Sequence, residues 1–88
     1  DDIDDVTFLS PNPTNGVFTI AIETSILSGF DILVYNMLGQ ETFKKEVSSF
    51  LGEFKQEINL EDCLEGMYIV RVISDKGSSY TNRVSYIK

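Results

Sequence analysis

The sequence of 88 residues contains no histidine, no tryptophan and a single cysteine, Cys63. The absence of histidine removes the commonest general base and the commonest transition-metal ligand. One cysteine cannot form an internal disulfide or a cysteine-rich zinc site. Its acidic neighbour Asp62 disfavours a thiolate, so we expect Cys63 to be a buried or half-buried structural residue. No apolar run approaches the roughly 20 residues that span a bilayer.

Positive charge is also scarce, because seven lysines and arginines face fourteen acids and leave a net charge of −7. Such a surface repels phosphate backbones and anionic lipids, which argues against nucleic-acid partners and direct membrane insertion. The composition is otherwise globular, with 42% hydrophobic residues. The length suits one domain and is too short for two.

The residues that could support catalysis or metal binding lack the required arrangement. There is no Gly-x-Ser-x-Gly elbow, no phosphate-binding glycine loop, and no lysine in an apolar setting. Two acidic clusters could offer oxygen ligands to calcium, but neither has the spacing of an EF-hand loop. They are Asp1, Asp2, Asp4 and Asp5, and Glu61, Asp62 and Glu65. We therefore expect no catalytic residues, no metal and no cofactor, and no enzymatic activity.

Seven short segments show the alternation of a β-strand, for example Phe18, Ile20 and Ile22 on one face of the second. They span residues 6–10, 17–23, 30–36, 41–47, 53–60, 67–74 and 78–87. Turn-forming residues separate these segments. We predict a positive φ for Gly39, and Asp-Lys-Gly at 75–77 is typical of a hairpin turn. A helix over 48–64 is the one competing interpretation, and Gly52 argues against it. The pattern predicts an antiparallel β-sandwich.

Four blocks of the sequence then resemble the C-terminal sorting domains of the bacterial type IX secretion system. The first is Ser-Pro-Asn-Pro-Thr-Asn-Gly-Val-Phe at 10–18, and the second is Leu-Val-Tyr-Asn-Met-Leu-Gly-Gln-Glu at 33–41. The third is Gly-Met-Tyr-Ile-Val-Arg-Val at 66–72, and the last is Arg-Val-Ser-Tyr-Ile-Lys at 83–88. Their order and spacing match those of the family, and together they make the resemblance specific.

The resemblance implies an immunoglobulin-like antiparallel β-sandwich of about seven strands. It also implies a signal that carries a secreted cargo from the periplasm across the outer membrane of a Gram-negative bacterium to the cell surface or beyond. The implied partners are the upstream cargo, the outer-membrane type IX translocon with its shuttle proteins, and a surface sortase. The sortase removes the domain and can join the cargo to anionic lipopolysaccharide.

The resemblance also nominates functional residues. A terminal edge strand can be extended by a partner's strand, so the candidate recognition residues for translocon or sortase are Val84, Ser85, Tyr86, Ile87 and Lys88. The other motif residues are expected to be structural: Pro11, Asn12, Pro13, Gly16, Gly39, Gly66 and Tyr68. Residues 1–5 are expected to be an acidic linker to the cargo, with residues 6–88 as the sorting domain. The start at Asp1 rather than methionine fits a piece of a longer precursor.

Two alternatives belong to the class of binding modules. An accessory module of a secreted enzyme could bind carbohydrate or protein, although carbohydrate-binding sandwiches usually display a row of exposed aromatic side chains. The chain could also self-associate through its edge strands as a weak homodimer.

Overall fold

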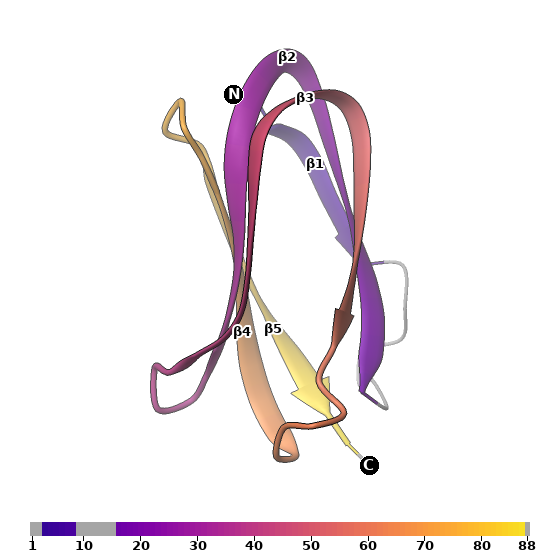
Figure 1. Ribbon diagram of the computed structural model, residues 1–88, viewed down its shortest axis with the longest axis vertical. Coiled ribbons are helices and arrows are strands. Elements are labelled where there is room, and N and C mark those ends of the chain that lie inside the picture. Colours follow the sequence, from indigo (N-terminus) through magenta and orange to yellow (C-terminus); the bar gives the residue numbers. More distant parts are fainter. Residues whose placement is uncertain (1–2, 9–15, 88) are drawn as a thin grey trace.

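The computed structural model describes residues 3–8 and 16–87, and these residues form an all-β, antiparallel structure (Figure 1). Its strands are β1 (Ile3–Phe8), β2 (Val17–Asn36), β3 (Glu41–Asn59), β4 (Gly66–Ser74) and β5 (Ser79–Tyr86). No helix that could cross a membrane occurs among the described residues.

The two long strands, β2 and β3, bend together into an arch at the upper end of the molecule in Figure 1. The first half of β2 lies between β1 and the end of β3, whereas its second half lies between β4 and the start of β3. β5 extends the sheet beyond β4. The two halves of β2 are thus central strands in different parts of one folded sheet. For the second half, this confirms the central position predicted from the apolar character of both faces at 30–36.

The described residues form five strands rather than the seven predicted, and the difference lies in the arch. Residues 24–29 and 48–52, expected to be connections, belong to β2 and β3, whose pairing continues through the bend with register irregularities around Ser28. Serine and glycine here serve a bend instead of a turn, because both strands continue through it and their pairing resumes on each side of residues 25–27. The helical alternative over 48–64 is wrong, since this region is largely strand. β1 begins at Ile3, so it includes three residues of the expected linker.

Gly29 shows why the arch needs a small residue. A Cβ atom at this position would lie 2.6 Å from the carbonyl oxygen of Ser48 and 3.0 Å from that of Val47. The Gly29 carbonyl also accepts a hydrogen bond of 2.9 Å from the backbone N–H of Asp75. Gly29 therefore allows the backbones of β2 and β3 to approach each other beside the turn that joins β4 to β5.

One hydrophobic core is formed by the inward-facing residues of β2, β4, β5 and the end of β3. The predicted alternation is confirmed at 18–22, at 30–34 and over β4, where the inward-facing residue of each pair is buried. Its members are Phe18, Ile20, Ile22, Phe30, Ile32, Val34, Ile58, Leu60, Tyr68, Val70, Val72, Val84 and Tyr86. Phe54 joins the arch end of this core through edge-to-face contacts with Phe30 and Phe50.

Candidate docking surface at the C-terminal strand

The end of β5 divides its side chains between the core and the surface. Val84 and Tyr86 are 1% and 2% exposed, and the Tyr86 ring packs at 6.5 Å from the ring of Tyr68. Ser85 is half-buried, and Ile87, just after the strand, is 52% exposed. A partner can therefore reach the side chains of Ser85 and Ile87, whereas those of Val84 and Tyr86 hold the domain together.

β5 also lies at one edge of the sheet, with β4 as its neighbour among the described strands. The register places Ser85 opposite Met67 and Tyr86 opposite Gly66. This pairing brings the C-terminal strand to the lower end of the molecule in Figure 1, where β4 begins. A strand supplied by a partner would approach from the side of β5 that faces away from β4.

Where β4 begins lies a hollow of about 400 Å³ between the β2–β3 turn and the β3–β4 loop, hereafter the end hollow. Its apolar side chains come from both connections and from the start of β4: Met37, Leu38, Leu64 and Met67. Asp62 and Glu65 also line it. Leu38 and Leu64 are 84% and 83% exposed, so these leucines stand in solvent without burial in the core.

Hydrogen bonds hold both walls of the end hollow. In the turn, the Asn36 side-chain oxygen accepts from the backbone N–H of Leu38 at 2.9 Å and of Gln40 at 3.0 Å. In the loop, the Tyr68 hydroxyl donates to the carbonyl oxygen of Leu64 at 2.5 Å. Burial of the Tyr68 hydroxyl, assisted by the neighbouring Cys63 thiol, raises the pKa of Tyr68 above its usual value of 10.0.

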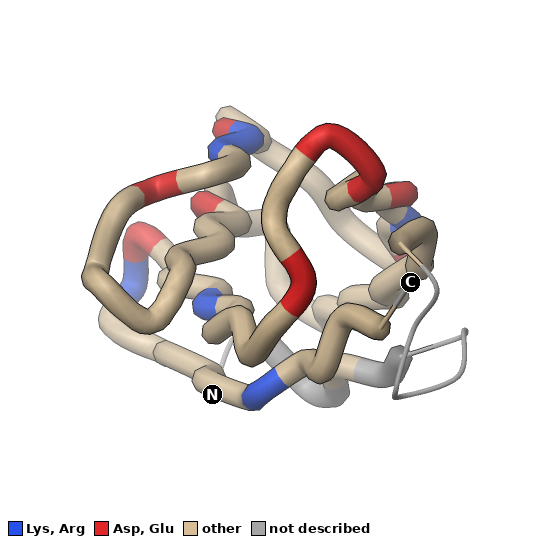
Figure 2. The backbone as a smooth tube through the Cα atoms, turned by 90° about the horizontal axis from the view of Figure 1, so that it is seen from below, with Lys and Arg blue, Asp and Glu red and all other residues tan. Residues whose placement is uncertain are grey.

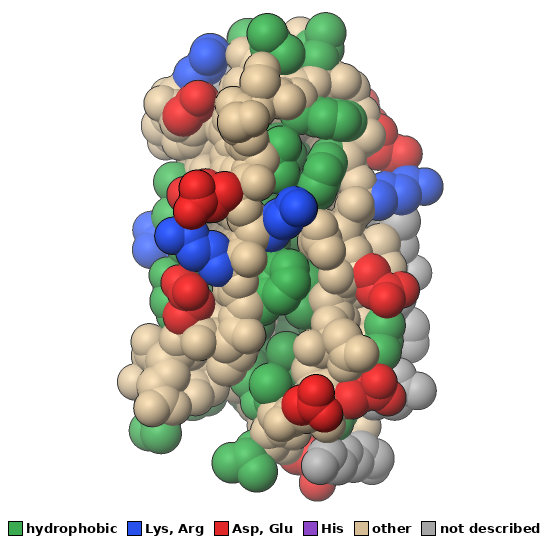
Figure 3. Space-filling model, viewed as in Figure 1, with side chains coloured by type: hydrophobic (Ala, Val, Ile, Leu, Met, Phe, Trp, Pro, Cys, Tyr) green, Lys and Arg blue, Asp and Glu red, His purple; other side chains and the backbone are tan. Residues whose placement is uncertain are grey.

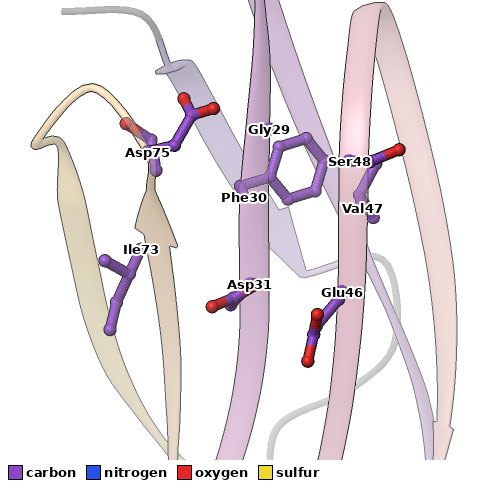
Figure 4. Close-up of a pocket in the computed structure, with 9 residues that line it drawn as sticks. Gly29, Phe30, Asp31, Glu46, Val47, Ser48, Ile73 and Asp75 are labelled. Carbon is purple, nitrogen blue, oxygen red and sulfur yellow. The ribbon is translucent and has the colours of Figure 1, made fainter.

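A second hollow, of about 460 Å³, lies near the arch between β2, β3 and the turn after β4. Figure 4 shows Asp31 and Glu46 on adjacent strands and Asp75 above them. Asp31 and Glu46 are directly paired in the register, an arrangement of like charges that costs stability. Across residues 3–8 and 16–87 there is no group of three or more histidine, cysteine or acidic residues placed to hold a metal ion.

The comparison with protein families decides the identity of the chain. A family model described as the secretion system C-terminal sorting domain matches residues 9–87. The chain belongs to this family. The sorting domain is therefore a type IX secretion signal, which implies interaction with the type IX machinery and export to the cell surface or the extracellular space of a Gram-negative bacterium. Such domains are generally non-catalytic tails. No curated protein and no solved structure matches the chain.

The structure places the family-motif residues of the sorting domain at its ends. Gly39 has a φ of +84° in the β2–β3 turn, which confirms the predicted positive value. The Gly16 carbonyl accepts a hydrogen bond from Leu60 where β2 begins, and Gly66 opens β4. Tyr68 is buried in the core with its hydroxyl bonded to the adjacent loop. The candidates Pro11, Asn12, Pro13 and Lys88 lie outside the described residues.

The roles of Asn36, Leu38 and Leu64 at the end hollow are not predicted from the sequence. Asn36 ends the predicted strand at 30–36, and strand alternation does not reveal its second role. Asparagine before a turn is the available signal that its side chain accepts backbone hydrogen bonds. The sequence does not indicate that Leu38 and Leu64 share an exposed surface. Each lies in a different connection, and only the fold brings these two connections to the same hollow. Cys63 is half-buried, as predicted.

Proposed function

We propose that this domain sorts its upstream cargo by presenting the outward side of its C-terminal strand to the outer-membrane type IX translocon. The recognition segment is Val84–Lys88, with the accessible side chains of Ser85 and Ile87 as direct contacts. The membership of the family over residues 9–87 carries the sorting role. The exposure of Ile87 beside two buried core residues supports the choice of contacts.

In this proposal, the precursor is carried through the periplasm and shuttle proteins deliver it to the translocon. A surface sortase then cleaves at or before the acidic residues 1–5, and the cargo is released or joined to anionic lipopolysaccharide. Residues 6–88 are the sorting domain, which has no enzymatic activity. Because β1 already starts at Ile3, the accessible scissile backbone lies at or before Asp2.

The proposed architecture is an immunoglobulin-like sandwich in which β2 and β3 each supply two of the seven segments. One layer consists of β1, the first half of β2 and the second half of β3. The other consists of the first half of β3, the second half of β2, β4 and β5. This division resembles immunoglobulin-type sandwiches, in which the first, second and fifth segments share a sheet.

The carbohydrate-binding alternative has less support. The large hydrophobic side chains that are exposed among the described residues are aliphatic or methionine, and none is aromatic. The flat aromatic platform that favours sugar binding is therefore absent from the described surface.

The test is export of a neutral reporter fused ahead of residues 1–88, with a signal peptide, in a strain that has the type IX machinery. Ile87→Glu places a charge in the proposed contact, and Ile26→Glu is its matched control, because Ile26 is 50% exposed in the arch at the opposite end. We expect Ile87→Glu to remain in the periplasm and Ile26→Glu to be exported. Equal export of both folded variants would contradict recognition through the C-terminal strand.

A further inference from the structure

The lower end of the domain combines exposed aliphatic side chains with negative charge. Figure 3 shows hydrophobic side chains at this end with acidic side chains beside them. Seen from below in Figure 2, acidic positions of the backbone lie among the parts nearest the viewer. The residues that line the end hollow include Asp62 and Glu65 and no lysine or arginine.

From this arrangement we infer that the end hollow binds a basic protein surface, which inserts an apolar side chain between Leu38 and Leu64. The inference names the chemistry of a partner for the sorting role and rests on that role. Leu38 and Leu64 supply apolar area that is lost from water only when a partner covers it. Asp62 and Glu65 at the rim attract lysine or arginine and favour one orientation of the partner.

The charge also selects among the occupants that an apolar hollow could accept. A second copy of this chain would bring the same acids together across the contact, which like-charge repulsion disfavours. An anionic lipid surface is repelled in the same way, because the whole chain carries −7. A basic partner is the occupant for which both the apolar and the charged parts of the hollow are attractive.

The walls of the end hollow are already ordered. The side chain of Asn36 fixes the turn that carries Leu38, and the hydroxyl of Tyr68 fixes the loop at Leu64. A partner therefore loses little affinity to the ordering of these segments. Met67, which lines the hollow, is paired with Ser85, so the hollow and the C-terminal strand form adjoining parts of one surface.

The test uses the folded 88-residue domain and a labelled synthetic peptide of alternating lysine and leucine, with binding followed by fluorescence anisotropy. A lysine–serine peptide removes the apolar part of the probe, and a glutamate–leucine peptide reverses its charge. We expect the lysine–leucine peptide to bind most tightly and to weaken as salt is added. Equal binding of either control peptide would overturn the inference.

Substitutions locate the binding. Leu64→Ser should weaken the lysine–leucine peptide by about tenfold, as expected for the loss of one buried leucine. Its control is Leu27→Ser in the arch, which should change nothing. Asp62→Asn should weaken binding and flatten the salt dependence, whereas the charge-matched Glu23→Gln should not. An equal loss from Glu23→Gln would assign the binding to general charge, and an equal loss from Leu27→Ser would assign it to exposed apolar side chains in general; either result would overturn the inference.

Two further experiments test whether a second copy of this chain or a lipid surface fills the end hollow instead. Self-association in analytical ultracentrifugation that is abolished by Leu64→Ser would overturn the inference in favour of a second copy. Binding of the domain to neutral phosphatidylcholine vesicles through Leu64 would overturn it in favour of lipid. The reporter fusion separates this inference from the sorting role, because failure of the wild-type fusion to be exported removes the role. Normal export with peptide binding unaffected by Leu64→Ser removes only the inference.

Discussion

Ending the chain at Asn82 should unfold this domain rather than simply remove a recognition sequence. The deletion takes away Val84 and Tyr86, two side chains that are almost fully buried in the core. It also removes the ring that packs against Tyr68 and shortens β5 to half its length. Both side chains belong to the one hydrophobic core, so their loss leaves part of that core without its packing partners.

The size of the effect follows from the burial. Removal of a buried aromatic side chain typically costs about 3–5 kcal/mol, and burying a valine contributes about 1.5–3 kcal/mol. A domain of this length has a free energy of unfolding of roughly 4–13 kcal/mol. The deletion therefore removes much or all of the stability. A chain that ends at Tyr86 loses only exposed or undescribed residues, and its stability should stay within about 1 kcal/mol of the intact domain.

Urea unfolding followed by circular dichroism compares the three chains. The intact domain and the chain ending at Tyr86 should unfold cooperatively with closely similar midpoints. The chain ending at Asn82 should show no folded baseline, or a midpoint lower by at least about 4.5 M if the m value is about 1 kcal/mol/M. A chain ending at Asn82 with the stability of the intact domain would refute the assignment of Val84 and Tyr86 to the core.

Three further substitutions test other parts of the structure. Gly29→Ala should destabilise the domain by about 1–3 kcal/mol, because the new Cβ meets the Ser48 carbonyl oxygen, and an unchanged urea midpoint would count against the close approach at the arch. Tyr68→Phe should cost about 0.5–1.5 kcal/mol at pH 7 through its lost hydrogen bond. Because the folded-state pKa of Tyr68 is raised, the wild-type domain loses stability above pH 10, whereas the Tyr68→Phe domain does not lose stability through this group. The difference in free energy of unfolding between the two should therefore narrow above pH 10, and a constant difference would argue against the raised pKa. Asn36→Ala should cost about 1 kcal/mol and increase amide exchange at Leu38, and unaltered exchange would show that the turn does not depend on this side chain.

The strand faces were predictable from sequence because alternation reports directly on burial. The alternation predicts that Phe18, Ile20 and Ile22 share one face of a strand, and all three lie in the core. Gly39 was equally predictable, since a glycine between two polar-ended strands favours a turn with positive φ. Local pattern is sufficient where a residue's role depends only on its neighbours along the chain.

The arch and the end hollow were not predictable in this way. Ser28 and Gly29 have the composition of a loop, yet they lie buried in a continuous strand because β3 bends alongside β2. Leu38 and Leu64 are 26 positions apart in sequence, and their common surface depends on how two separate connections meet. The sorting role came from the combination of motifs, because no single residue carries a chemical signature of it.

The central claim is that these 88 residues are a sufficient type IX sorting signal. The most direct measurement places them behind a signal peptide and a neutral reporter, and compares the location of the reporter in matched strains with and without the type IX translocon. The account predicts reporter at the cell surface or in the medium of the first strain and in the periplasm of the second. Periplasmic retention in both strains, with the domain folded, would contradict it.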